Sequence, residues 1–293
     1  MSLFSKDGGD GARSTETRVK LRRRAILAVA DRDAPGVVAL QRAYVLSQIF
    51  DARLFVVHAL PNGAQPLVEH EDAVRSAVVE WAAATAKVAL APQDVEVDVG
   101  HPARAVERAA RAVGAELIVV GAPHTLDEDG SAGSEDRLAN TIADLAGSLS
   151  RGLLVAHPPR TRCELVAATD LRDARFPVVK TAAQLADALS ARVTVVHNLE
   201  QDGPVLSLAL ETVAGRLQVL ERLASELDGV RGGHVSTTRT TAEAIADVAR
   251  SRDADIAVVG IRRGHGRTLL SLLGRTRCSV LAIPLAMNAA ADG

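Results

Sequence analysis

The sequence predicts an α/β protein made of two tandem domains, each a five-stranded parallel sheet with helices on both faces. Three observations lead to this fold class. Short aliphatic runs alternate with longer amphipathic stretches, the same order of runs occurs twice, and landmark residues recur at one constant spacing. A length of 293 residues also fits two domains of ordinary size.

Five aliphatic runs in the first half have the length and composition of buried strands. They cover residues 26–30, 54–57, 95–99, 117–120 and 153–156. Apolar residues at helical spacing fill the stretches between them, at 37–50, 71–90, 103–113 and 138–149. Aliphatic strands separated by helices are typical of parallel strands joined by crossover helices, so both faces of the sheet are expected to be covered.

The second half repeats this order, with strands expected at 165–169, 193–196, 234–238, 256–259 and 280–283. Three pairs of residues are each 139 positions apart: Asp31 and Asp170, His58 and His197, and Gly121 and Gly260. The string AELIVVG at 115–121 also aligns with ADIAVVG at 254–260. A constant offset indicates a duplicated domain.

The duplication predicts four segments along the chain. Residues 1–24 form a flexible basic tail of net charge +4, 25–158 the first domain, 159–288 the second domain and 289–293 a C-terminal tail. The tail lacks the apolar stretch of a signal peptide, and it is either a solvated tail or a weak contact for an anionic partner. The boundary between the domains falls at the two prolines of HPPRTR, residues 157–162.

Composition excludes several classes of function. With 34 basic and 36 acidic residues, the net charge of −2 gives no field that would attract nucleic acid or a membrane surface. Two cysteines cannot build a disulfide scaffold, and no apolar run approaches the roughly 20 residues that span a bilayer. We therefore expect a cytoplasmic protein without nucleic acid or membrane partners.

Polar residues and glycines follow the expected strands at one edge of each sheet. In an open parallel sheet, ligands bind beyond the carboxyl ends of the strands, where the strand order reverses. Asp31 and Asp170 follow the first strand of each copy and could accept hydrogen bonds from a ribose or a base. Gly121 and Gly260 follow the fourth strand, where bare backbone lets amides approach a phosphate.

No catalytic constellation is found in the sequence. There is no GxxxxGK[ST] loop, no GxGxxG after the first strand of either copy, and no GxSxG elbow. His, Cys and carboxylate residues do not cluster with metal-ligand spacing. The sequence therefore predicts a protein that is not an enzyme and that requires no metal or cofactor.

A first strand ending in Asp, a second ending in VVH and a fourth ending in VVG resemble the universal stress protein family, in two tandem copies. The resemblance implies a Rossmann-like fold of the adenine-nucleotide α-hydrolase type and a role in bacterial stress adaptation. For members that bind nucleotides, the resemblance implies a glycine pattern after strand four. This pattern is Gly, two residues, Gly, nine residues, then Gly and Ser or Thr. The aspartate of strand one then lies near the adenosine.

The first copy departs from this pattern, so its site is predicted to be degenerate. His124 stands where the second glycine belongs, and Ala139–Asn140 replaces Gly–Ser at the expected start of the closing helix. The stretched loop between them, TLDEDGSAGSEDRL, has a net charge of −4. A triphosphate entering this acidic loop would meet like charges, which is unfavourable even when salt screens them. The degenerate site comprises Asp31, Gly121, His124 and Asn140.

The second copy loses the nine-residue bridge and becomes cationic. Its candidate nucleotide or anion site comprises Asp170, Gly260, Arg262, Arg263, Gly264, Gly266 and Arg267. Arginines ahead of a helix N-terminus suit a phosphate-bearing ligand, ATP or a smaller nucleotide. The alternative is a solvated basic turn between strand and helix.

The final strands, LLVAH at 153–157 and VLAIP at 280–284, are apolar, and in the family's strand order they lie at a sheet edge. An exposed apolar edge pairs readily with another strand. We expect these edges to pair within the chain, as a pseudo-twofold pair of domains, because a tethered partner is present at ~mM effective concentration.

The resemblance and the two candidate sites leave two functions open. The first is a non-enzymatic regulatory protein with an unidentified protein partner, and the second is a nucleotide-binding protein with slow hydrolysis in the second domain. Further pairing into a homodimer stays open.

Overall fold

The structure is a computed structural model that describes residues 24–60, 71–123, 135–148, 150–160, 163–173, 175–199, 206–238, 240–262 and 266–285. The first domain contains, in chain order, β1 (Ala25–Val29), α2 (Ala34–Phe50), β2 (Arg53–Leu60), α3 (Glu71–Trp81) continued by a π-helical turn (Ala82–Ala86), a 3-10 turn (Pro92–Asp94), β3 (Val95–Val99), α4 (Pro102–Ala112), β4 (Ala115–Gly121), α5 (Glu135–Ser148) and β5 (Gly152–Ala156).

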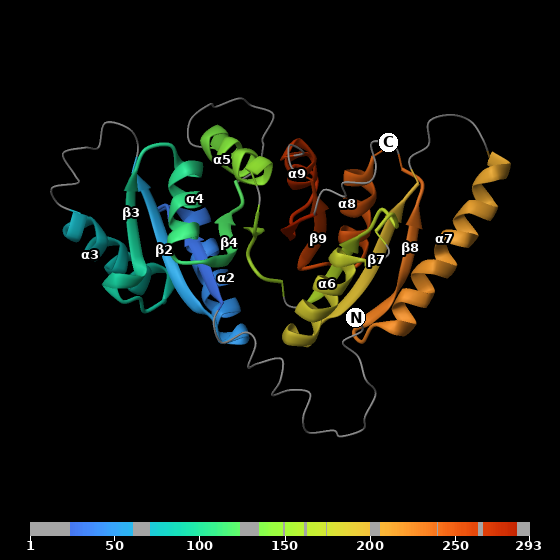
Figure 1. Cartoon of the computed structure of the whole chain (residues 1–293), viewed down its shortest axis with the longest axis horizontal. Helices are drawn as coiled ribbons and strands as arrows, with labels where there is room; N and C mark the ends of the chain where they lie inside the picture. Colours follow the sequence, from blue (N-terminus) through green and yellow to red (C-terminus); the bar gives the residue numbers. More distant parts are fainter. Residues whose placement is uncertain are drawn as a thin grey trace, which may run out of the picture.

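The second domain repeats this succession of strands and helices. It contains β6 (Glu164–Ala168), α6 (Pro177–Leu189), β7 (Arg192–Asn198), α7 (Leu206–Glu226), β8 (Val230–Ser236), α8 (Thr241–Ser251), β9 (Ile256–Ile261), α9 (Gly266–Leu273) and β10 (Ser279–Pro284). All ten predicted strands are present, and the predicted α/β fold class is confirmed (Figure 1).

The two five-stranded sheets join edge to edge into one sheet of ten strands, in the order β3-β2-β1-β4-β5-β10-β9-β6-β7-β8. Neighbouring strands are parallel within each domain, whereas β5 and β10 are antiparallel, with Leu281 opposite Leu154. The predicted pairing of the final strands within the chain is confirmed. We call the β5–β10 junction the seam. Because it is antiparallel, the strands of the two domains point in opposite directions, and the carboxyl ends of one set lie level with the amino ends of the other.

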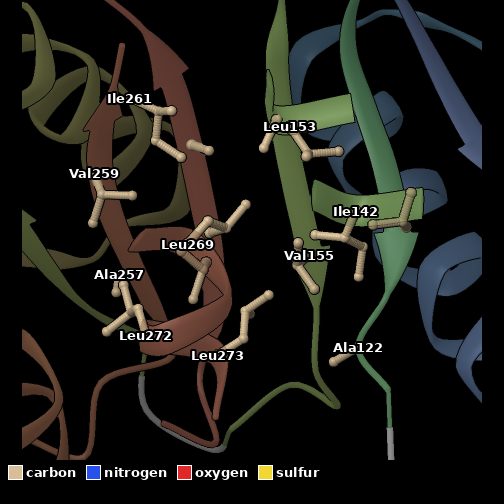
Figure 2. Close-up of a cluster of buried hydrophobic side chains, with 14 of the residues drawn as sticks. Ala122, Ile142, Leu153, Val155, Ala257, Val259, Ile261, Leu269, Leu272 and Leu273 are labelled. Carbon is tan, nitrogen blue, oxygen red and sulfur yellow. The ribbon is translucent and has the colours of Figure 1, made fainter. Parts of the chain in front are cut away.

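Side chains alternate along the strands and build a separate apolar cluster on each face of the sheet. Leu153 and Val155 belong to one cluster, with α4, α5, α8 and α9 above them, whereas Leu154 belongs to the other, with α2 and α6. Figure 2 shows the first cluster at the seam, where Ile142 of α5 and Leu269 of α9 point toward the strands. Each cluster contains residues of both domains, so the core is continuous across the seam.

Several predicted element boundaries were wrong, including those of α5, α3 and β8. Helix α5 begins at Glu135 and not at 138. Helix α3 gives way to a π-helical turn at Ala82, although apolar spacing predicted a helix as far as 90. Strand β8 begins at Val230, four residues before the predicted start, and includes two glycines of low strand propensity.

One of these glycines is explained by packing. A β-carbon on Gly233 would lie 2.2 Å from the β-carbon of Leu220, a buried residue of α7. The close approach of helix to strand therefore requires glycine at this position. The neighbour that requires Gly233 is 13 residues away in sequence, so no local pattern signals this contact.

Candidate functional site

The two candidate sites lie at the carboxyl ends of β1 and β4 in the first domain and of β6 and β9 in the second. In both domains these strands are neighbours at the point where the strand order reverses. The sites lie at opposite edges of the joined sheet because β5 and β10 are antiparallel. The structure therefore separates the two sets of predicted residues, and each site stands alone.

In the first domain, the first turn of α2 lies directly against both strand ends. A β-carbon on Gly121 would lie 2.2 Å from the carbonyl oxygen of Pro35, and one on Gly36 would lie 1.8 Å from the carbonyl oxygen of Asp31. The side chain of Asp33 caps this helix by accepting a 2.8 Å hydrogen bond from the amide of Gly36. Gly121 thus has a packing reason that involves no ligand.

Backbone groups beyond β4 are also occupied by the fold. The amide of Ala122 donates a 2.9 Å hydrogen bond to the carbonyl oxygen of Ala156, so it extends the ladder between β4 and β5. The Nδ1 atom of His58 lies 2.7 Å from the carbonyl oxygen of Ala30. Since a carbonyl oxygen only accepts, the proton of this contact is on Nδ1. The Ala122 amide and the Ala30 carbonyl oxygen are therefore already hydrogen-bonded within the fold.

Asp31 is the charged residue at this edge whose titration is perturbed. Loss of hydration against the surrounding protein raises the pKa of its carboxyl, the His58 ring opposes this rise, and Asp33 adds to it. Asp31 as a whole is nonetheless exposed. The rise in its pKa therefore comes from neighbouring protein that partly covers the carboxyl, and not from a closed pocket. An anionic ligand beside Asp31 would add a further like charge.

In the second domain a different residue covers the equivalent glycine. A β-carbon on Gly260 would lie 2.7 Å from Cδ1 of Leu285, which follows β10 and bonds through its amide to the carbonyl oxygen of Ile261. His197 repeats the contact of its counterpart, with Nδ1 2.9 Å from the carbonyl oxygen of Thr169. Each histidine therefore bonds to the backbone just beyond the end of a neighbouring strand, β1 for His58 and β6 for His197.

Two predicted residues of the second site come together. One oxygen of Asp170 accepts a 3.0 Å hydrogen bond from the amide of Arg172, and the other lies 3.5 Å from a terminal nitrogen of Arg262. The side chains of Asp170 and Arg262 are each about half exposed, at 48% and 52%. An exposed arginine at a strand end can exchange this long contact for a ligand anion at small cost.

The other predicted site residues are placed only in part. His124, Arg263 and Gly264 lie outside the described residues, and so does the side chain of Arg267, although Gly266 begins α9. Asn140 is exposed within α5 and not at its start, which corrects the expectation that Ala139–Asn140 would begin the closing helix. The site role of these residues stays a prediction.

Sequence reasoning missed the two residues that pack on the strand-end glycines. Pro35 follows the capping residue Asp33, so its place in a first helical turn carried a sequence signal. Leu285 gave no signal, because its contact with Gly260 depends on the direction of the chain after β10. A strand-end glycine is consistent with a phosphate or with a close side chain, and only the three-dimensional packing separates these two cases.

The remaining features of the described residues add no second candidate site. They contain no group of three or more His, Cys, Asp or Glu that could hold a metal ion, and none of their helices is long and apolar enough to cross a membrane. A cavity of about 30 Å³ beneath α4 and α5 is lined in part by Glu107 and Ser148, and an open hollow of about 390 Å³ is lined in part by Arg75 and Pro92. No strand-end residue described above lines either of these cavities.

Solved structures that match nearly the whole chain share this fold. A universal stress protein from Archaeoglobus fulgidus DSM 4304 is 14% identical, with a TM-score of 0.63, covering 92% of this chain and 98% of that chain. A functionally unknown protein from Pseudomonas aeruginosa PAO1 is 17% identical, with a TM-score of 0.58, covering 91% and 94%. A shorter universal stress protein from Archaeoglobus fulgidus, in complex with dAMP, is 23% identical, with a TM-score of 0.32, covering 42% and 97%.

Comparison with curated protein sequences gives no match. The family model described as the universal stress protein family matches twice, at residues 22–135 and 164–284. The first matched segment contains β1 to β4, the second contains β6 to β10, and together they cover most of the chain. This chain therefore belongs to the universal stress protein family, with two family domains in tandem.

Proposed function

We propose that this protein acts in stress adaptation as a regulatory protein that works by binding and not by catalysis, and that its first domain holds no nucleotide in its strand-end crevice. The contact of Pro35 with Gly121 carries the proposal. The residue that would bring backbone amides to a phosphate serves instead to seat α2 on the sheet. The Ala122 amide, bonded to Ala156, supports the same conclusion.

A nucleotide site in the second domain, with slow hydrolysis, is the second candidate. The observation that favours it is the half-exposed Arg262 beside Asp170, at the strand end next to the first turn of α9. Arginine suits a phosphate because its planar fork donates two hydrogen bonds. Against this candidate stands Leu285, whose side chain already packs on Gly260.

Titration of the purified chain with ATP, ADP, AMP, cAMP and dAMP, followed by thermal unfolding, separates the two candidates. A ligand present at 100 times its Kd adds roughly 2.7 kcal/mol, which shifts the unfolding midpoint visibly. We expect no shift with any of these nucleotides. Inorganic phosphate release, measured on the same samples with ATP, is expected to stay at the rate of the buffer blank.

Variants assign any shift that does occur to a domain. A shift lost in Arg262→Ala and in Arg267→Ala but retained in Asp31→Ala would support the second candidate and keep the first-domain proposal. Arg53→Ala is the matched control, because it removes an exposed arginine from an ion pair with Asp94, far from both sites. A shift abolished by Asp31→Ala alone would overturn the proposal for the first domain.

A further inference from the structure

A buried ion pair crosses the seam between the two domains. Arg42 of α2 donates from its two terminal nitrogens to the carboxylate of Asp255, at 2.9 and 2.5 Å. The two side chains are only 12% and 4% exposed. Asp255 directly precedes β9, so the pair joins a helix of the first domain to a strand of the second. Neither the seam nor this pair is part of the candidate nucleotide sites.

Further hydrogen bonds complete the polar cluster around this pair. The Nε atom of Arg42 donates to the carbonyl oxygen of His157 at 3.2 Å, and the amide of His157 donates to Oγ of Ser279 at 3.1 Å. The amide of Arg160 donates to Asp255 at 2.9 Å. Among the described residues, no buried side-chain nitrogen or oxygen lacks a partner. The pair is therefore a fully satisfied bidentate contact, the geometry in which buried charges are tolerated.

The duplication makes the two sides of the seam comparable residue by residue. The final strands are offset by 127 positions, so Leu281 is the counterpart of Leu154, and these two residues pair directly across the seam. The pseudo-twofold axis thus passes through this pair. A contact between two copies of β10 would accordingly place residue 281 of one chain opposite residue 281 of the other.

The counterpart of Arg42, at the offset of 139, is Thr181 of α6. The equivalence holds in the structure because α2 and α6 end at the equivalent residues Asp51 and Ser190, both left-handed. The hydroxyl of Thr181 donates to the carbonyl oxygen of Pro177 in its own helix. The second domain therefore carries no arginine at the place from which Arg42 reaches across the seam.

The counterpart of Asp255 is Glu116 in β4. Leu117 and Ile256, which follow these two residues, pair with equivalent residues of β1 and β6. The side chain of Glu116 is 53% exposed and pairs with Arg24, which directly precedes β1 and does not come from across the seam. The pseudo-twofold axis relates two positions at the seam, one at Asp255 and one at Glu116, which we call its corners. The corner at Asp255 holds a buried carboxylate that needs a cation from the other domain.

We propose that the Arg42–Asp255 pair makes the seam a selective interface, in which β10 accepts the edge of the first domain and rejects a second copy of β10. Two second domains joined through β10 would set Thr181 against Asp255 at both corners. Each corner would then hold a buried carboxylate without a cation, which is strongly unfavourable. The apolar strands supply the attraction, and the buried charge selects the partner.

The test uses the full chain with Leu281→Cys as a reporter. Opposed residues of an antiparallel pair are close enough to form a disulfide, so two copies of β10 in contact become covalently linked in a glutathione redox buffer. The chain with Leu281→Cys alone is expected to stay monomeric on non-reducing electrophoresis. Adding Arg42→Met removes the selection, and the disulfide-linked dimer is expected to increase roughly tenfold or more.

A second variant keeps the test valid if the unpaired carboxylate prevents folding. Adding Asp255→Asn to Arg42→Met removes the buried charge while retaining an acceptor for the amide of Arg160, and circular dichroism checks that the chain is folded. This variant is expected to form the same dimer. Equal dimer fractions with and without Arg42, or no dimer in either Arg42→Met chain, would overturn the proposal.

Two controls isolate the cause. Arg53→Met with Leu281→Cys breaks an exposed ion pair with Asp94 and is expected to form no additional dimer. Arg42→Met without Leu281→Cys reports any disulfide that forms through the native Cys163 or Cys278. Its dimer fraction is the background from which the signal is measured.

Discussion

Gly121 and Gly260 occupy equivalent strand ends but make room for different neighbours. Pro35 lies against the first and Leu285 against the second, one from the helix after β1 and the other from the segment after β10. The duplicated positions have therefore diverged in the contact that requires glycine. Gly121 is explained by main-chain crowding, whereas the side chain of Leu285 can rotate, so the first position is the more restrictive of the two.

Gly121→Ala is expected to destabilise the chain by about 1–3 kcal/mol, the usual cost of overpacking. The added methyl would lie 2.2 Å from a backbone oxygen that cannot move without shifting α2. Urea unfolding measures the change. Gly215→Ala, on an exposed face of α7 with no atom within 4 Å of the new methyl, is the control and is expected to stabilise by about 1 kcal/mol. An unchanged midpoint for Gly121→Ala would contradict the packing argument.

Asp31→Asn is expected to stabilise the chain at pH 7 by less than about 1 kcal/mol, since the residue is exposed. Burial of the carboxyl raises its pKa above the ordinary value of 3.8, so the folded chain binds this proton more tightly than the unfolded chain. Ionisation therefore costs stability as the pH rises through this range. Melting curves from pH 3 to pH 7 should show the gain vanish near pH 3. A gain of equal size at both ends would contradict this assignment.

At the residue scale, the sequence located the strand-end residues but not their neighbours. Asp31 and Asp170 were predicted correctly beyond the ends of β1 and β6, because periodicity and the 139-residue offset both fix these positions. The strand expected to end just before His58 instead continues to Leu60, so His58 lies inside β2. The bond from His58 to the carbonyl oxygen of Ala30 follows from the pairing of β1 with β2. The contact of Leu285 with Gly260 depends on tertiary packing, which no local pattern encodes.

At the element scale, the type and order of the elements were predicted better than their ends. The aliphatic runs fixed the strands, but the start of β8 was wrong because Gly233 is placed by Leu220 of a different element. Helix ends depend on single residues in unusual backbone conformations. Asp51 and Ser190, 139 positions apart, both end a helix with positive φ, at 49° and 52°. The duplication therefore retained this conformation without glycine.

Ser190→Gly is expected to stabilise the chain by about 1 kcal/mol, because a left-handed residue with a β-carbon is strained and glycine is not. Gly229→Ala is the converse variant, because it adds a β-carbon to a residue with positive φ. Gly229 has a φ of 80°, and a β-carbon there would approach no atom closer than 3.9 Å, so the expected loss of about 1 kcal/mol arises from the backbone alone. Urea unfolding of both variants measures the two changes. The same sign for both would contradict the conformational argument.

At the scale of the whole molecule, the two domains share their core. Both apolar clusters contain residues of both domains, and the seam adds a strand pair and the packing of α5 against α9 (Figure 2). The sequence predicted the pairing of the final strands, because two apolar edges in one chain have few other partners. It gave no sign of Arg42 and Asp255, which are 213 residues apart and face each other only once the seam has formed.

A shared core predicts that the two domains unfold together, in one calorimetric transition whose van't Hoff and calorimetric enthalpies agree. Leu281→Lys tests the seam as the source of this cooperativity. Leu281 is 8% exposed and lies opposite Leu154, so a lysine there would bury an unpaired ammonium group and lower stability by several kcal/mol. We expect a lower midpoint, with two transitions or a larger mass by light scattering. Val219→Lys, at a position 37% exposed on α7, is the control and should change stability by no more than about 0.5 kcal/mol. Unchanged stability and mass for Leu281→Lys would mean that the domains are held together elsewhere.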